Sequence, residues 1–150
     1  MMSNEAVTHV TFKALMTPFR RVTDQFTVSP QIAVSDVAAA AEQGFVLIIN
    51  NRPDGEDPAQ PAGAEIEAAA RAAGLDYLAI PIRGGPDAAQ VDAQREAMDQ
   101  ASGPVLAYCR SGTRSIVTWA LGQAAAGRTD RQTLVALGAE AGYDLSGVVG

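Results

Sequence analysis

Apolar residues in this chain gather in three short continuous runs, each about the length of one β-strand. The runs occupy residues 45–49, 77–80 and 105–108. A continuous apolar run of this length is typical of a strand that is covered on both faces, as in a parallel sheet. Shorter alternating patterns at 9–12 and 20–28 predict an N-terminal hairpin or edge strands. We therefore expect three buried strands and a weaker N-terminal pair.

Segments with the apolar spacing of helices separate these runs. The predicted helices cover 35–42, 61–73, 87 to about 103, a stretch that begins at 116, and 129–141. Ser35, Asp87 and either Thr129 or Asp130 have the side chains expected at N-caps. Strands that alternate with helices predict an α/β fold: one domain over residues 1–150, with a mostly parallel sheet flanked by helices and residues 1–8 flexible.

Three polar loops follow the three predicted buried strands. They begin at Asn50, Pro81 and Cys109. The carboxyl ends of parallel strands lie at one edge of a sheet, and ligands of such sheets bind there. We therefore expect the three loops to meet and to form one site.

The third loop carries the strongest candidate chemistry. It begins at Cys109, ends at Arg114 and leads directly into a helix. Backbone N–H groups and the positive end of the helix dipole converge at such a point, which favours a bound anion. We expect this environment to stabilise the thiolate of Cys109 and to give a nucleophile at neutral pH. Arg114 adds a fork of N–H donors that matches a tetrahedral oxyanion.

The residues between and after these two have supporting roles in this interpretation. Gly112 lets the backbone turn with a positive φ. Ser115, the expected N-cap of the next helix, could donate a hydrogen bond to the sulfur when it leaves. The alternative is a buried structural cysteine followed by a solvated basic turn. The candidate oxyanion-binding residues of the loop are Arg110, Ser111, Gly112 and Thr113.

The other two loops offer carboxylates for proton transfer and one more cation. Asp54 is either a general acid or the partner of Arg52 or Arg114 in a bidentate ion pair, and Glu56 lies in the same loop. Arg52 is a further candidate for substrate binding. Asp87 is the nearest carboxylate on the second loop, and its alternative role is to cap a helix. A cysteine that attacks a phosphate ester needs an acid for the leaving oxygen and then a base for water.

Composition excludes several classes of function. A formal net charge of −6 disfavours nucleic acid and anionic membranes as partners. A single cysteine cannot form an internal disulfide and suits a reducing compartment, so we expect a cytoplasmic protein. A single histidine makes a histidine-rich metal site or a Ser-His-Asp triad improbable. We expect no metal and no organic cofactor.

Three segments resemble the bacterial β-lactamase-hydrolase-like phosphatase family. They are Ile-Asn-Asn-Arg-Pro-Asp-Gly-Glu at 49–56, Ala-Gly-Leu-Asp-Tyr at 73–77 with Ile80-Pro81 after it, and 103–115 around the cysteine. The resemblance covers roughly residues 20–125. It implies the fold of dual-specificity phosphatases and a phosphocysteine mechanism. In that mechanism Cys109 attacks phosphorus, the loop amides and Arg114 hold the oxyanion, and water then releases phosphate from a phosphotyrosine-like or other phosphomonoester.

The loop also departs from that pattern. Tyrosine phosphatases usually have five residues between the cysteine and the arginine, preceded by a histidine, whereas this chain has four residues there and Tyr108 before the cysteine. The short loop resembles that of rhodaneses, in which the cysteine carries a persulfide. Three hypotheses follow: a cysteine-dependent phosphatase acting on a phosphorylated small molecule or phosphoprotein, a sulfurtransferase with a persulfide on Cys109, and a non-catalytic module that binds oxyanions.

Overall fold

A five-stranded sheet forms the centre of the computed structural model, which describes residues 17–149. The strands are β1 (Arg20–Arg21), β2 (Phe26–Ser29), β3 (Leu47–Asn50), β4 (Asp76–Ala79) and β5 (Val105–Tyr108). Their order is β1-β2-β5-β3-β4; β1 is antiparallel to β2, and all other neighbours are parallel. The predicted mostly parallel α/β sheet is confirmed, as is a strand pair within 20–28. The expectations for residues 1–8 and 9–12 fall outside the described residues.

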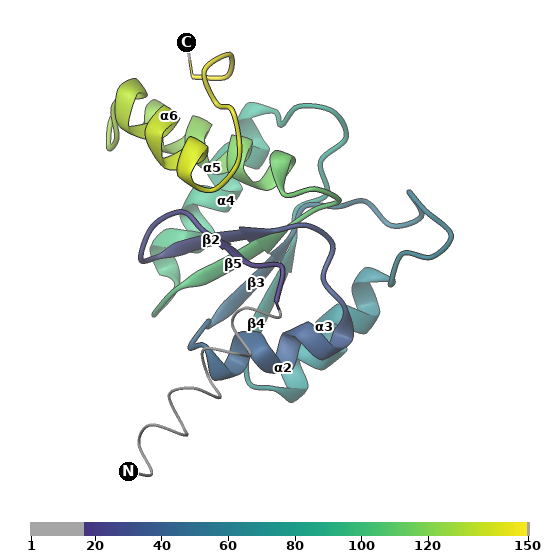
Figure 1. Ribbon diagram of the computed structural model, residues 1–150. Coiled ribbons are helices and arrows are strands. Elements are labelled where there is room, and N and C mark those ends of the chain that lie inside the picture. Colours follow the sequence, from purple (N-terminus) through teal and green to yellow (C-terminus); the bar gives the residue numbers. More distant parts are fainter. Residues whose placement is uncertain (1–16, 150) are drawn as a thin grey trace, which may run out of the picture.

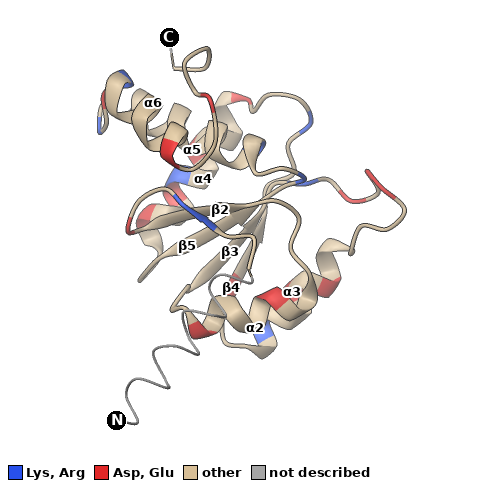
Figure 2. Cartoon of the chain, in the orientation of Figure 1, with Lys and Arg blue, Asp and Glu red and all other residues tan. Residues whose placement is uncertain are grey.

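Helices cover both faces of this sheet (Figure 1). They are α2 (Val34–Glu42), α3 (Gly63–Ala72), α4 (Ala88–Gln100), α5 (Thr113–Ala125) and α6 (Arg131–Glu140). The helices α2 and α3 lie on one face, and α4, α5 and α6 lie on the other. Charged residues are found on the helices, on the loops and on the edge strands β1 and β4, whereas the central strands β2, β5 and β3 contain none (Figure 2). Between residues 17 and 149, no helix has the length and apolar character needed to cross a lipid bilayer.

The pleat of the strands divides the apolar side chains into two cores. In β5, Val105 and Ala107 face α5 and α6, whereas Leu106 and Tyr108 face α2 and α3. This alternation follows from the two-residue period of a strand. The larger core also contains four buried residues from the C-terminal part of the chain, which are Leu134, Ala141, Leu145 and Val149.

Strand β4 is more exposed than its apolar sequence predicts. It pairs with β3 alone and lies at the edge of the sheet. Leu78 is 36% exposed, whereas Leu75 and Ile80, just outside the strand, are buried. The expectation of a strand covered on both faces is therefore wrong here, because an edge strand has fewer neighbours and the apolar residues on either side of it do the packing.

Two predicted helix starts are also wrong. The N-cap of α2 is Ala33 and not Ser35, and the carboxylate of Asp36 accepts a hydrogen bond from the Ala33 N–H at 2.8 Å. The N-cap of α5 is Gly112, so Ser115 lies within the first turn. The positive φ of Gly112 lets the chain enter the helix three residues earlier than the side-chain pattern indicates.

Candidate active site

The predicted loops meet at the carboxyl edge of the sheet. Asn50, at the end of β3, is in register with Tyr108 of β5 and with Ala79 of β4. The pairing continues into the loops, where the Asn51 N–H donates to the Tyr108 carbonyl at 2.8 Å. A fourth loop, after β2, joins them, since the Gln31 N–H donates to the Arg110 carbonyl at 3.2 Å.

Cys109 lies at the centre of this edge and faces the start of α5. Its side chain is fully buried, and its Sγ accepts a hydrogen bond from the Gly112 N–H at 3.1 Å. Gly112 has a φ of 93°, a conformation that residues with a Cβ rarely adopt. The loop therefore turns back on the sulfur and directs a backbone donor at it, as the sequence predicts.

Arg114 is fixed by carbonyl and carboxylate oxygens from two other loops. Its Nη1 donates to Glu56 Oε2 and to the Ile82 carbonyl, both at 2.8 Å, and its Nη2 donates to Glu56 Oε1 at 2.9 Å. The hydrogen bonds to Glu56 raise the pKa of Arg114 above its ordinary value, and the nearby Cys109 acts in the same direction. The guanidinium is therefore a permanent cation beside the sulfur.

Glu56 connects two arginines. Besides Arg114, it accepts from Arg52 Nε at 2.9 Å, while Arg52 Nη1 donates to Gln31 Oε1 at 3.0 Å. Mainly because of the hydrogen bond from Arg114, the pKa of Glu56 falls from 4.5 to about 2, so the carboxylate is ionised at neutral pH. The sequence analysis left Asp54 as either a general acid or the bidentate partner of an arginine, and in the structure Glu56 is the bidentate partner of Arg114.

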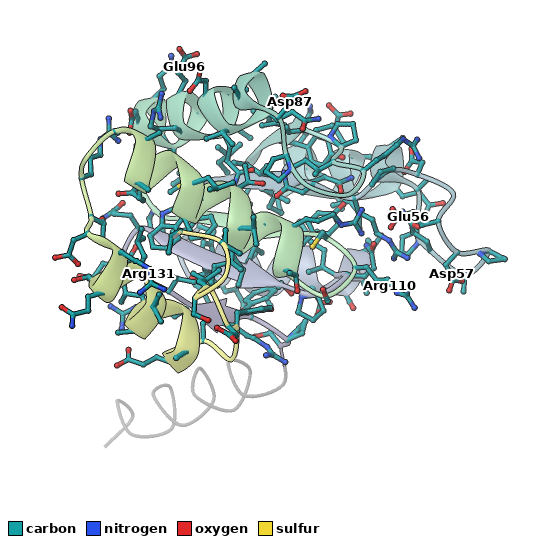
Figure 3. The ribbon with its side chains drawn as sticks, turned by 90° about the horizontal axis from the view of Figure 1, so that it is seen from above. Glu56, Asp57, Asp87, Glu96, Arg110 and Arg131 are labelled. Atoms are coloured by element: carbon teal, nitrogen blue, oxygen red, sulfur yellow. The ribbon has the colours of Figure 1, made fainter. Side chains whose placement is uncertain are left out.

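Asp54 and Asp87 each bind the start of a helix. Asp54 Oδ1 accepts from the Gly63 N–H, the first of α3, at 2.8 Å. Asp87 is the N-cap of α4, and its Oδ1 accepts from the Gln90 N–H at 2.8 Å. The predicted capping role of Asp87 is confirmed. Figure 3 shows Asp87 at the start of α4 and Glu56 on the loop after β3.

Ser115 is buried beneath the loop, and its Oγ has no hydrogen-bond partner within residues 17–149. The carbonyl of the same residue accepts from Gln94 Nε2 at 3.3 Å, and Gln94 Oε1 accepts from Asn51 Nδ2 at 2.9 Å. This buried chain of amides links the loop after β3 to the first turn of α5. A free Oγ in such a place can still donate to a neighbouring acceptor.

The remaining loop residues face outward. Ser111 Oγ donates to Thr113 Oγ1 at 2.9 Å, and both residues are exposed. Arg110 is exposed as well and lies at the same end of the molecule as Glu56 (Figure 3). Neither the Arg110 nor the Arg83 side chain contacts a partner within the described part of the chain. These two guanidiniums on loops of the site are therefore open to solvent.

Two residues at this edge carried no signal in the sequence. Gln31 holds Arg52, and Tyr143, beyond α6, donates from its hydroxyl to the Ser111 carbonyl at 2.8 Å. Both contacts join segments that are far apart in the sequence, so local patterns do not reveal them. Among residues 17–149 there is no cluster of three or more histidine, cysteine or acidic side chains that could hold a metal ion.

Comparisons with known proteins agree on one kind of domain. Residues 18–126 match the model of the β-lactamase hydrolase-like protein, phosphatase-like domain. A β-lactamase hydrolase-like protein of Agrobacterium fabrum is 40% identical over 127 residues, which make up 83% of this chain and 29% of that protein. The chain thus spans less than a third of the length of the curated relatives it matches.

Solved structures give the same result. A crystal structure named as a candidate phosphatase from Neisseria meningitidis has a TM-score of 0.77 and 31% identity, covering 87% of this chain and 92% of the other. TpbA of P. aeruginosa, solved in complex with phosphotyrosine, has a TM-score of 0.60 and 18% identity, covering 89% of this chain and 75% of the other. The second likeness is one of fold alone.

Proposed function

Because the chain belongs to the family of the β-lactamase hydrolase-like phosphatase-like domain, we propose that it is a cysteine-dependent phosphatase that hydrolyses phosphomonoesters. The observation that carries this proposal is the bond between the Gly112 N–H and Cys109 Sγ, with Arg114 fixed beside the sulfur. Nucleophile, backbone donor and cation have the arrangement that a phosphoryl group requires.

The reaction has two steps. The Cys109 thiolate attacks phosphorus, an S–P bond forms as the P–O bond of the ester breaks, and the leaving oxygen takes up a proton. Water then attacks the phosphocysteine, the S–P bond breaks, and inorganic phosphate and the thiolate are released. No oxidant, reductant or cofactor is consumed. Ser115, whose Oγ is unpartnered among the described residues, is proposed to donate to the sulfur when it leaves.

Arg114 keeps donors for the substrate despite its ion pair. A guanidinium has five N–H donors, and three are used by Glu56 and the Ile82 carbonyl. The Nε–H and one Nη2–H lie on one edge of the planar group, and this pair matches two oxygens of a phosphoryl group. Glu56 thus positions Arg114 without blocking it, and Arg52 supports Glu56.

Glu56 is unsuited to be the proton donor, because a pKa of about 2 keeps it ionised where a general acid must be protonated. Asp54 and Asp87 remain the candidates for this role. Each uses Oδ1 for a helix start, which leaves its Oδ2 for proton transfer. An aryl ester with a good leaving group depends less on such a donor than an alkyl ester does.

The substrate is proposed to be a phosphotyrosine-like or other small phosphomonoester, or a phosphoprotein. Ser111, Gly112 and Thr113 would offer the loop amides to its oxygens. The exposed guanidiniums of Arg110 and Arg83, unpartnered within residues 17–149, are proposed to attract an anionic substrate to these loops.

Sulfur transfer is the second candidate, since only four residues separate Cys109 from Arg114 and a smaller ring of amides suits a compact sulfur. A module that binds oxyanions without turnover is the third. The test is turnover of p-nitrophenyl phosphate and phosphotyrosine by the wild type and by Cys109→Ser. We expect the substitution to lower turnover by at least about a thousandfold, since it removes the nucleophile.

Parallel assays separate the alternatives. Thiosulfate with cyanide reports sulfur transfer, and mass spectrometry distinguishes a phosphoryl from a sulfur adduct on Cys109. Phosphate turnover that survives in a folded Cys109→Ser protein would overturn the phosphatase mechanism. Phosphate binding with no turnover of either donor would identify the non-catalytic module.

A further inference from the structure

In one peptide unit of the cysteine loop, both the C=O and the N–H form hydrogen bonds. The Ser111 carbonyl accepts from the Tyr143 hydroxyl at 2.8 Å, and the Gly112 N–H donates to Cys109 Sγ at 3.1 Å. These two groups belong to the same planar unit. In a trans peptide the C=O and the N–H point in nearly opposite directions, so fixing one of them fixes the other.

Tyr143 is itself held in place. Gly142, with a φ of 95°, ends α6, and the Tyr143 N–H donates to the Gly138 carbonyl at 2.8 Å. Arg20 lies over the tyrosine ring at 5.4 Å from its centroid. The hydroxyl lies so close to the loop that a Cβ on Gly112 would collide with its oxygen. The hydroxyl is therefore fixed at the outer side of the loop.

Without this hydroxyl the peptide unit has an alternative orientation. Glycine is stable on both sides of φ = 0°, so Gly112 permits the unit to rotate and to turn the Ser111 carbonyl toward the sulfur. A carbonyl oxygen there would repel a thiolate and a bound oxyanion. Burial raises the pKa of Tyr143 above its ordinary value, so the hydroxyl remains a donor at neutral pH.

We propose that Tyr143 is a positioning residue of the active site, whose hydroxyl holds the 111–112 peptide so that its N–H faces Cys109 and the bound phosphoryl group. Tyr143 lies outside residues 18–126, the part that matches the phosphatase-like domain, and seventeen residues beyond its end. The catalytic importance of this contact rests on the proposed phosphatase function. The effect of this contact on the ionisation of the Cys109 thiol does not rest on that function.

The test uses alkylation of Cys109, the only cysteine of the chain, by iodoacetamide as a function of pH. Thiolate reacts and thiol does not, so the curve reports ionisation at this one residue. Tyr143→Phe removes the hydroxyl and retains the ring. We expect its curve to move to higher pH, with alkylation slowed by about tenfold below the wild-type midpoint and unchanged at high pH.

Ser146→Ala is the matched control. It also removes a hydroxyl from the C-terminal segment, one that donates to Asp144 Oδ1 at 2.6 Å and does not contact the loop. Its curve should equal that of the wild type. The proposal would be overturned by an unchanged curve for Tyr143→Phe, or by an equal shift for Ser146→Ala. A second readout is the inorganic phosphate concentration that half-protects Cys109, which should rise in Tyr143→Phe alone.

A further measurement needs no variant. In wild-type protein labelled with ¹⁵N-glycine, the Gly112 amide should exchange with solvent much more slowly than that of Gly85, an exposed loop residue. Equal exchange rates would contradict the fixed peptide. The two proposals fail separately, because a shifted alkylation curve in a protein without turnover would support Tyr143 and refute the phosphatase.

Discussion

The helices α4 and α5 pack against each other, yet their N-termini are built in opposite ways. The first N–H groups of α4 are satisfied by its own cap, since Asp87 accepts from the Gln90 N–H. The N-cap of α5, Gly112, has no side chain to cap the helix, and its own N–H donates to Cys109 Sγ. A capped start contributes stability to the fold, and an uncapped start can bind an anion.

The other helices follow the pattern of α4. A carboxylate accepts a backbone N–H near the start of each: Asp36 at α2, Asp54 at α3 and Asp130 at α6. No carboxylate accepts a backbone N–H at the start of α5, and its first turn contains Arg114. A cation at the positive end of a helix dipole is unfavourable, and Glu56 from a distant loop compensates for it. This exception to the pattern marks the site.

The largest expected effect is that of Gly112→Ala, which changes the uncapped start itself. The positive φ costs a residue with a Cβ about 1–2 kcal/mol, and the new Cβ would collide with the Tyr143 hydroxyl. We expect the free energy of unfolding to fall by at least this amount and turnover to fall by about a hundredfold or more. Urea unfolding and steady-state kinetics measure both. Near wild-type turnover would show that the loop tolerates another path.

Glu56→Gln has the next largest effect, since it removes the charge that compensates Arg114. Misplacement of this guanidinium should lower turnover by about tenfold to a hundredfold. Glu96→Gln is the matched control, because Glu96 points outward from α4 (Figure 3). Equal losses in the two variants would show that the Glu56–Arg114 pair has no specific role in catalysis.

The same pair predicts a pH dependence of stability. The pKa of Glu56 is lowered in the folded protein to about 2, so its stabilising contribution is present above the ordinary value of 4.5 and is lost as the pH falls toward 2. The difference in unfolding free energy between wild type and Glu56→Gln should therefore shrink over this interval. A constant difference would mean that the charge of Glu56 does not stabilise the fold.

The smallest expected effect is that of substitutions at Asp87, which change the capped start of α4. Asp87→Ala removes the cap of α4 and should lower the free energy of unfolding by about 1 kcal/mol, whereas Asp87→Asn retains a capping side chain and should cost only a few tenths. Thermal unfolding measures this. If Asp87 also donates a proton, Asp87→Asn will lose turnover of alkyl phosphates while keeping that of p-nitrophenyl phosphate.

Short-range features of this molecule were predictable from the sequence, and long-range partners were not. The cap at Asp87, the turn at Gly112 and the convergence of the loops follow from local patterns and from the geometry of parallel strands. The contact between Glu56 and Arg114 spans 58 residues, and that between Ser111 and Tyr143 spans 32. Their side chains have no local preference for one another, so only the folded chain brings them together.

The burial of some residues was also predicted wrongly from local patterns. The apolar run at 77–80 predicts a strand buried on both faces, but the sheet order places β4 at an edge. Ser115 has the side chain of an N-cap, but the positive φ of Gly112 starts the helix earlier and leaves its hydroxyl inside. In both cases the position in the fold overrides the preference of the residue type.

The four C-terminal residues in the larger core have a practical consequence for anyone who moves this domain into another protein. The match to the family model ends at residue 126, yet four residues beyond it belong to the same core as Ile116 of α5: Leu134, Ala141, Leu145 and Val149. A gene fragment that ends at residue 126 would encode a chain that lacks these residues, and part of its larger core would be exposed to water. The transplantable unit must reach at least to Val149.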